Sequence, residues 1–191
     1  MKLIMNGEIS QKTSSGLFPL SLSNSAVRYF LLFTIGSFAM VVHARLRLHL
    51  GIPGHQGLLY MATLVGASSL LSTRFAGLTF AAGSSLILSL GLLGFGNPFM
   101  AAEYMFLGIV ADVFLNLSRN RDYKVLYIIL VGALGYGMIP VVRMIITSIS
   151  GYPFGSFVKY GFGVTLISHI AFGVLGSLSG FGISKLICKK K

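Results

Sequence analysis

The sequence contains few charged residues, and very few acidic ones. Charged residues make up 10% of the 191 residues, whereas an ordinary soluble domain has about 25%. This number of charges is too small to cover a water-exposed surface. A soluble protein is therefore excluded. The acidic residues number only four: Glu8, Glu103, Asp112 and Asp122. Because Asp112 is the only aspartate within an apolar run, an intramembrane protease that uses two aspartates is also excluded.

Cysteine and the common catalytic motifs are almost absent. The single cysteine, Cys188, excludes an internal disulfide and a metal site built from clustered cysteines. Cys188 lies in a lysine-rich tail, where a reactive or lipid-modified thiol is an open alternative to a residue without a special role. The chain has no P-loop, no Ser-His-Asp order and no His-Glu-x-x-His motif. We therefore expect no ATP hydrolysis by this chain, no enzyme activity and no cofactor. We also expect no metal, although the scattered histidines leave a metal site open as an alternative.

Apolar residues dominate what is present, at 54% of the chain, and they gather in six runs. Each run has 16 to 21 residues, close to the roughly 20 that cross a bilayer as a helix. The runs do not alternate as the strands of a membrane barrel would. The sequence therefore predicts an all-α integral membrane bundle. Its six transmembrane helices are expected over residues 29–44, 57–72, 75–95, 98–117, 125–142 with a possible extension to 149, and 164–183.

Lysine and arginine indicate the orientation of this bundle. The formal net charge is +11, which could suggest nucleic acid, but the cations stand at the ends of the apolar runs, as in membrane proteins. With a cytoplasmic N-terminus, 11 of the 15 Lys and Arg residues lie inside and four outside. We therefore expect both termini in the cytoplasm, contact with the lipid bilayer and no nucleic acid. The predicted organisation is an N-terminal lead at 1–24, a membrane domain at 25–186 and a basic tail at 187–191.

Polar side chains from several predicted helices reach one depth near the outer face. The candidate substrate-binding residues are Arg45, His55, Gln56, Glu103, Arg143 and His169. Ionisable groups inside a membrane usually face the bundle interior, so these residues predict a cavity open to the outside and net cationic. The loop at 51–57 is expected to cover it, because it combines Pro53 with three glycines. Such a site suits a small organic molecule with an anionic group.

Each of these residues also has a purely structural interpretation. Arg45 and Arg47 can extend to the membrane surface without binding anything. Glu103 can be a structural partner of Arg143 or of His169. His169 can be a satisfied core histidine, and His55 can serve only to shape its loop. Asp112, at the other end of the same helix and near Arg74 and Lys124, is interpreted as a structural ion pair or a coupling contact and not as a ligand-binding residue.

Small residues are frequent in the last apolar run. Gly173, Gly176 and Gly180 have the spacing that lets two helices approach closely. This stripe favours packing within the bundle, and a docking face for a partner membrane subunit is the alternative.

The order of motifs from the first to the sixth run resembles a known family. Arg45-Leu-Arg-Leu-His-Leu-Gly-Ile-Pro-Gly-His-Gln-Gly is followed by a small-residue helix and a glycine-rich helix. Gly-Phe-Gly-Asn-Pro-Phe (94–99) then leads into a helix that ends Gly108-Ile-Val-Ala-Asp112. The sixth run reads His169-Ile-Ala-Phe-Gly173-Val-Leu-Gly176-Ser-Leu-Ser-Gly180. The chain after about residue 25 is similar to the substrate-binding S components of energy-coupling factor (ECF) transporters.

The resemblance implies a function and a set of partners. An S component binds a vitamin, a cofactor precursor or a metal ion near the outer face. It docks on a membrane scaffold subunit that carries two ATPase subunits, and it topples in the membrane to release its ligand inside. The implied role is substrate capture for an ECF-type ABC importer in a bacterial or archaeal cytoplasmic membrane. Two alternatives stay open: a stand-alone carrier driven by a gradient, and a membrane enzyme or assembly factor that acts on a lipid head group.

Overall fold

The computed structural model describes residues 24–46, 51–91, 93–94, 97–119 and 124–189. Within these residues every regular element is a helix, which confirms the all-α prediction. The elements are α1 (Ser25–Arg45), α2 (Gly57–Leu71), α3 (Ala76–Ser89), α4 (Met100–Arg119), α5 (Lys124–Leu130), the π-helix η1 (Val131–Tyr136), α6 (Gly137–Ser150) and α7 (Gly155–Lys189). Because α5, η1 and α6 continue directly into one another, the described chain forms six rods.

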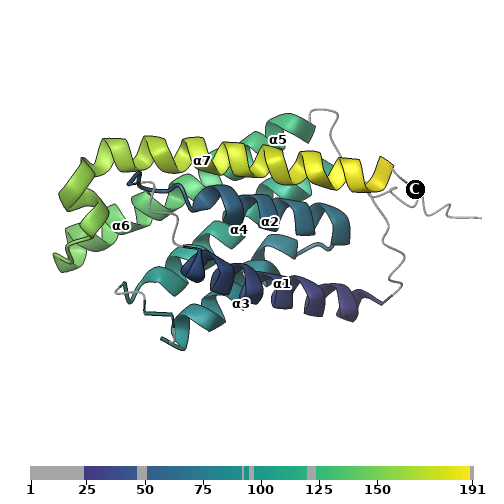
Figure 1. Cartoon of the computed structure of the whole chain (residues 1–191), viewed down its shortest axis with the longest axis horizontal. Coiled ribbons are helices and arrows are strands. Elements are labelled where there is room, and N and C mark those ends of the chain that lie inside the picture. The colour runs from purple at the N-terminus through teal and green to yellow at the C-terminus, as the bar shows by residue number, and fades with distance from the viewer. Residues whose placement is uncertain (1–23, 47–50, 92, 95–96, 120–123, 190–191) are drawn as a thin grey trace, which may run out of the picture.

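The rods run up and down in one bundle. Helix α1 begins and α7 ends at the same end of the molecule (Figure 1). Helix α2 packs along α7, α3 packs against both α1 and α4, and η1 packs against α7. This arrangement brings the loop between α1 and α2 and the start of α7 to the opposite end, where the candidate site lies.

The described helices are those of a membrane-embedded protein. Four segments are long and apolar enough to cross a bilayer: Ser25–Arg45, Met100–Arg119, Lys124–Ser150 and Gly155–Lys189. Their outer faces carry exposed apolar side chains such as Phe30, Ile149 and Val158. Large exposed apolar surfaces are unfavourable in water and favourable against lipid.

Helix α3 ends well before the predicted residue 95, whereas α2 ends within one residue of its predicted end at 72. The two helices have 15 and 14 residues and therefore extend about 22 and 21 Å, less than the roughly 30 Å of a bilayer core. Helix α2 ends at Leu71, and the backbone of Ser72, its C-cap, is left-handed. Gly91, two residues beyond α3, also has a positive φ. The conformation at Gly91 interrupts the helical backbone where apolar composition alone would continue it.

The small residues of α7 pack inside the bundle. A Cβ added at Gly176 would lie 2.5 Å from the carbonyl oxygen of Leu58 on α2, and the backbones of Gly132 and Gly173 are in direct contact between η1 and α7. The packing interpretation of this stripe is therefore confirmed. Such close approach leaves little space between α7 and its neighbours α2 and η1.

The element α7 consists of two helices that meet at a kink at Gly161 (φ 76°, ψ 166°). A short helix begins at Gly155, where the sequence predicts no helix, and the long helix begins after the kink, close to the predicted start at 164. The long helix continues to Lys189, past the predicted end of the apolar run at 183. Lys185 and Lys189 follow the apolar run without ending the helix, because lysine is a good helix former. The predicted N-terminal lead lies outside the described residues except for Asn24, whose side chain accepts a hydrogen bond from the backbone N–H of Ala26.

Candidate ligand-binding cavity

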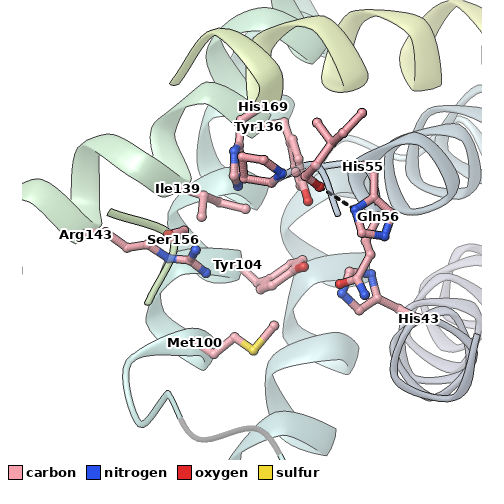
Figure 2. Close-up of a pocket in the computed structure, with 13 residues that line it drawn as sticks. His43, His55, Gln56, Met100, Tyr104, Tyr136, Ile139, Arg143, Ser156 and His169 are labelled. Carbon is pink, nitrogen blue, oxygen red and sulfur yellow. Dashed lines mark hydrogen bonds between the residues drawn. The ribbon is translucent and has the colours of Figure 1, made fainter. Parts of the chain in front are cut away.

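A cavity of about 220 Å³ opens at the end of the bundle where α1 ends. Its lining side chains come from α1, the loop that follows it, α4, η1, α6 and α7, and they converge on one space (Figure 2). The lining residues are His43, Ile52, Pro53, Gly54, His55, Gln56, Met100, Tyr104, Tyr136, Ile139, Arg143, Ser156 and His169.

The loop before α2 is closely fitted over this cavity. Gly54 has a φ of +78°, and a Cβ added there would lie 2.7 Å from Nδ1 of His169. Only glycine combines this backbone conformation with so close an approach. At the start of α7, the Tyr160 hydroxyl donates a hydrogen bond to the carbonyl of Gly51. The loop is therefore seated on α7 at two points, as the prediction of a covering loop requires.

An ion pair forms one side of the cavity. Arg143 donates from Nε to both carboxylate oxygens of Glu103 at 3.0 and 3.1 Å, and from Nη2 to Oε2 at 2.8 Å. The Glu103 side chain is fully buried and also accepts a 2.7 Å hydrogen bond from Asn97. The Nε and Nη2 groups of Arg143 and the amide of Asn97 together satisfy the carboxylate. A buried charge is tolerated when it is paired and hydrogen-bonded in this way.

Two histidines present a defined edge to the cavity. The Nδ1 atom of His55 lies 2.5 Å from the carbonyl oxygen of Ile52, and Nδ1 of His169 lies 2.7 Å from that of Thr165. A carbonyl can only accept a hydrogen bond, so each Nδ1 carries the proton. In the neutral ring Nε2 is then an acceptor. The Nε2 atom of His55 is buried and makes no hydrogen bond within the described chain.

Aromatic rings form the wall and floor. Tyr136 and His169 stack with centroids 5.0 Å apart and an interplanar angle of 21°. Tyr104 meets Tyr60 edge to face at 4.6 Å, and His43 packs against Tyr104 at 6.2 Å. Such pairs hold each ring in a narrow range of orientations. The cavity therefore has a rigid aromatic base below a loop and a polar rim.

The six predicted binding residues do not all lie at the cavity. His55, Gln56, Arg143 and His169 line the cavity, while Glu103 lies behind its wall as the partner of Arg143. Arg45 is exposed and does not line it. Arg47 lies outside the described residues.

The outward direction of Arg45 has a simple geometric cause. His43 points inward from the last turn of α1, and a residue two positions later is rotated by about 200° on a helix.

Comparisons with protein-family models, with curated proteins and with solved structures found no match to this chain. The chemistry of the cavity therefore has to be argued from its own residues. Within the described segments, no three His, Cys, Asp or Glu side chains come together as a metal site would require.

Several lining residues are absent from the sequence-based set, and part of the signal was present. His43 follows Gly36, Ala39 and Met40 on one buried face of α1, at helical spacing. Tyr136 and Ile139 precede Arg143 by seven and four residues, so they share its face. Ser156 could not be found, because the segment that carries it was expected to be a loop.

The described lining carries little formal charge. Arg143 is its only formal cation, and Glu103, behind the wall, is its ion-pair partner. The expectation of a net cationic cavity counted Arg45 as well as Arg143, and Arg45 does not line the cavity. That expectation stays a prediction.

Asp112 lies at the other end of α4 and has a structural partner. Its two carboxylate oxygens accept hydrogen bonds from the backbone N–H groups of Gly77 and Leu78, at 2.8 and 2.9 Å. These N–H groups belong to the first turn of α3, which has no intrahelical acceptor for them. Asp112 therefore has a structural role as the cap of a neighbouring helix, and among the described residues it forms no ion pair such as the sequence predicts.

Proposed function

We propose that this chain is the membrane-embedded substrate-capture subunit of an ECF-type importer, binding a small vitamin-like or cofactor-precursor molecule. The observation that carries the proposal is the cavity between the α1–α2 loop and the Tyr104–Tyr136–His169 base. It is small, polar at its rim and aromatic at its base, which is the usual make-up of a small-molecule site.

The orientation of the bundle is part of the proposal. All six rods cross the bilayer, both termini are cytoplasmic, and the cavity faces the outside. The positive-inside distribution of Lys and Arg supports this orientation. Helices α2 and α3 are accommodated by local thinning of the bilayer, which costs only fractions of a kcal/mol per Å of mismatch.

The energy source is supplied in trans. The sequence contains no P-loop, so import driven by ATP would need ATPase subunits on other chains. The resemblance to S components supports a membrane scaffold subunit with two ATPases as the partners. The cytoplasmic membrane of a bacterium or archaeon is the corresponding location.

Purification from native membranes tests the partners. Tagged full-length protein extracted in a mild detergent is expected to recover one membrane scaffold and two ATPase subunits. In vesicles, uptake of the retained small molecule is expected only when these partners and ATP are present. Repeated recovery of the chain alone, together with transport by the chain alone along an ion gradient, would establish the stand-alone carrier instead. Turnover of a lipid head group by the purified chain would establish the membrane enzyme.

A further inference from the structure

We infer that the ligand is an uncharged nitrogen heterocycle that carries N–H donors on one edge and a carbonyl or ring-nitrogen acceptor on another. The inference rests on the proposed function and narrows its substrate class. It replaces the sequence-based expectation of an anionic group. The argument uses the charge balance, the hydrogen-bonding edges and the shape of the cavity.

The charge balance disfavours an anion. Arg143 is the only formal cation in the described lining, and three of its contacts go to the fully buried carboxylate of Glu103. A ligand carboxylate would have to compete with Glu103 for the same guanidinium and would add a second negative charge beside it. Like charges this close are strongly unfavourable in a site of low dielectric constant.

In their neutral forms, His55 and His169 call for a ligand that donates hydrogen bonds. Because backbone carbonyls hold Nδ1–H of His55 and His169, both rings turn an Nε2 acceptor away from their anchor. The Nε2 atom of His55 is buried without a partner in the described chain. An unsatisfied buried polar atom is destabilising, and a hydrogen bond from a ligand N–H would remove that penalty.

The opposite edge of the cavity supplies donors. Arg143 uses Nε and Nη2 for Glu103, and in the described chain no hydrogen bond engages its Nη1 group. The Ser156 hydroxyl also lines the cavity and is buried without a partner among the described residues. Figure 2 shows the Arg143 guanidinium on the far side of the cavity from His55. A ligand carbonyl or ring nitrogen is the matching acceptor.

The shape of the cavity calls for a flat ring. Tyr136 and His169 form a stacked wall, and Tyr104 is held in place by Tyr60, so the π-faces are already ordered before a ligand enters. Met100 and Ile139 add apolar contact. The volume of about 220 Å³ is below the 300–1,000 Å³ of typical ligand pockets, so a single ring or a compact fused pair fits best.

Two measurements on the purified full-length chain test the inference. In the first, small molecules released from gently purified protein are identified by mass spectrometry, and an uncharged nitrogen heterocycle with N–H groups is expected. Release of an organic anion, a metal ion or a lipid would overturn the inference. The proposed function would still stand if the scaffold and ATPases co-purify.

If the protein retains nothing, the affinities of three probes test the inference. Cytosine, nicotinamide and nicotinate are each titrated into the protein by calorimetry. Nicotinamide and nicotinate have nearly the same size and differ in charge. We expect cytosine or nicotinamide to bind at least tenfold more tightly than nicotinate. Equal or tighter binding of nicotinate, or no binding of either neutral probe, would overturn the inference.

A matched pair of variants locates the hydrogen bond. In His55→Asn the amide nitrogen can replace Nδ1 and keep the bond to Ile52, while the Nε2 acceptor is lost. In His55→Gln the amide oxygen can reach the position of Nε2. We expect the bound neutral ring to lose at least tenfold in affinity in the first variant and to recover most of it in the second. Equal affinity in both variants and the unchanged protein would show that His55 contacts no ligand, against the inference.

Discussion

Helix α4 carries two buried carboxylates, one toward each end of the bundle, and they are held in opposite ways. Glu103 is paired with a cation on another rod, and that cation still has donors left beside a cavity. Asp112 accepts two backbone N–H groups of α3, whose hydrogen-bonding capacity is then exhausted. Burial of an acidic residue therefore does not identify a binding site. The hydrogen-bonding capacity that its partner retains is the better indicator.

The largest expected effect is the loss of stability on substitution of Glu103. Glu103→Gln leaves Arg143 in the bundle without a counterion, and breaking a buried pair in this way costs about 3–5 kcal/mol. The measurement is chemical unfolding in detergent, followed by circular dichroism. The double variant Glu103→Gln with Arg143→Gln is expected to recover much of the lost stability, because it removes the uncompensated charge. Equal losses in the single and double variants would contradict this account.

A smaller effect is expected at the Asp112 end. Asp112→Asn keeps one carbonyl acceptor for two backbone N–H groups, so one charge-assisted hydrogen bond of about 1.5–3 kcal/mol is lost. Ligand affinity is expected to stay within twofold of the unchanged protein, measured by the same titration. Loss of binding in Asp112→Asn with normal binding in Glu103→Gln would show that the ligand binds at the Asp112 end of the bundle, against the assigned site.

The loop above the cavity offers a comparison of two glycines. Gly51 and Gly54 both have positive φ, but an added Cβ meets nothing within 4 Å at Gly51 and meets His169 at Gly54. Alanine should therefore strain the backbone at both positions, while Gly54→Ala also overpacks against the ring, at an extra cost of about 1–3 kcal/mol. Only Gly54→Ala is expected to weaken ligand binding. Equal effects on stability and binding would show that the loop is not seated on His169.

The smallest effect is expected at Arg45. Its side chain is exposed at the end of α1 and does not line the cavity. Arg45→Ala should change the free energy of unfolding by less than about 0.5 kcal/mol and leave affinity unchanged. A tenfold loss of affinity would return Arg45 to the site and with it the cationic cavity that the sequence suggests.

Composition and periodicity were sufficient to predict the helical architecture and four of the residues that line the cavity. The convergence of His55, Gln56, Arg143 and His169 followed from membrane depth alone, because depth depends only on counting residues along each run. The direction of a side chain depends on helix rotation as well, and that is why Arg45 was included while His43 was left out.

Other features depend on backbone conformation, which the apolar pattern does not record. The early end of α3 involves the positive φ at Gly91. The short helix from Gly155 to the kink at Gly161 lies where the sequence predicts no helix. Pairing of Glu103 with Arg143 was one of two alternatives from the sequence, and only the packing of α4 against α6 decides between them.

The π-helix at Val131–Tyr136 lets the rod formed by α5, η1 and α6 hold an extra residue. A turn closed by i→i+5 bonds contains one residue more than an α-helical turn. Because the extra residue is taken up within one turn, removing one residue there would allow an ordinary α-helix to form while the residues after it keep their direction. Arg143 would then still face Glu103, whereas the side chains of the π segment itself would be repositioned. A relative with a one-residue gap in this segment would therefore be expected to keep the ion pair and to differ in the wall that Tyr136 forms.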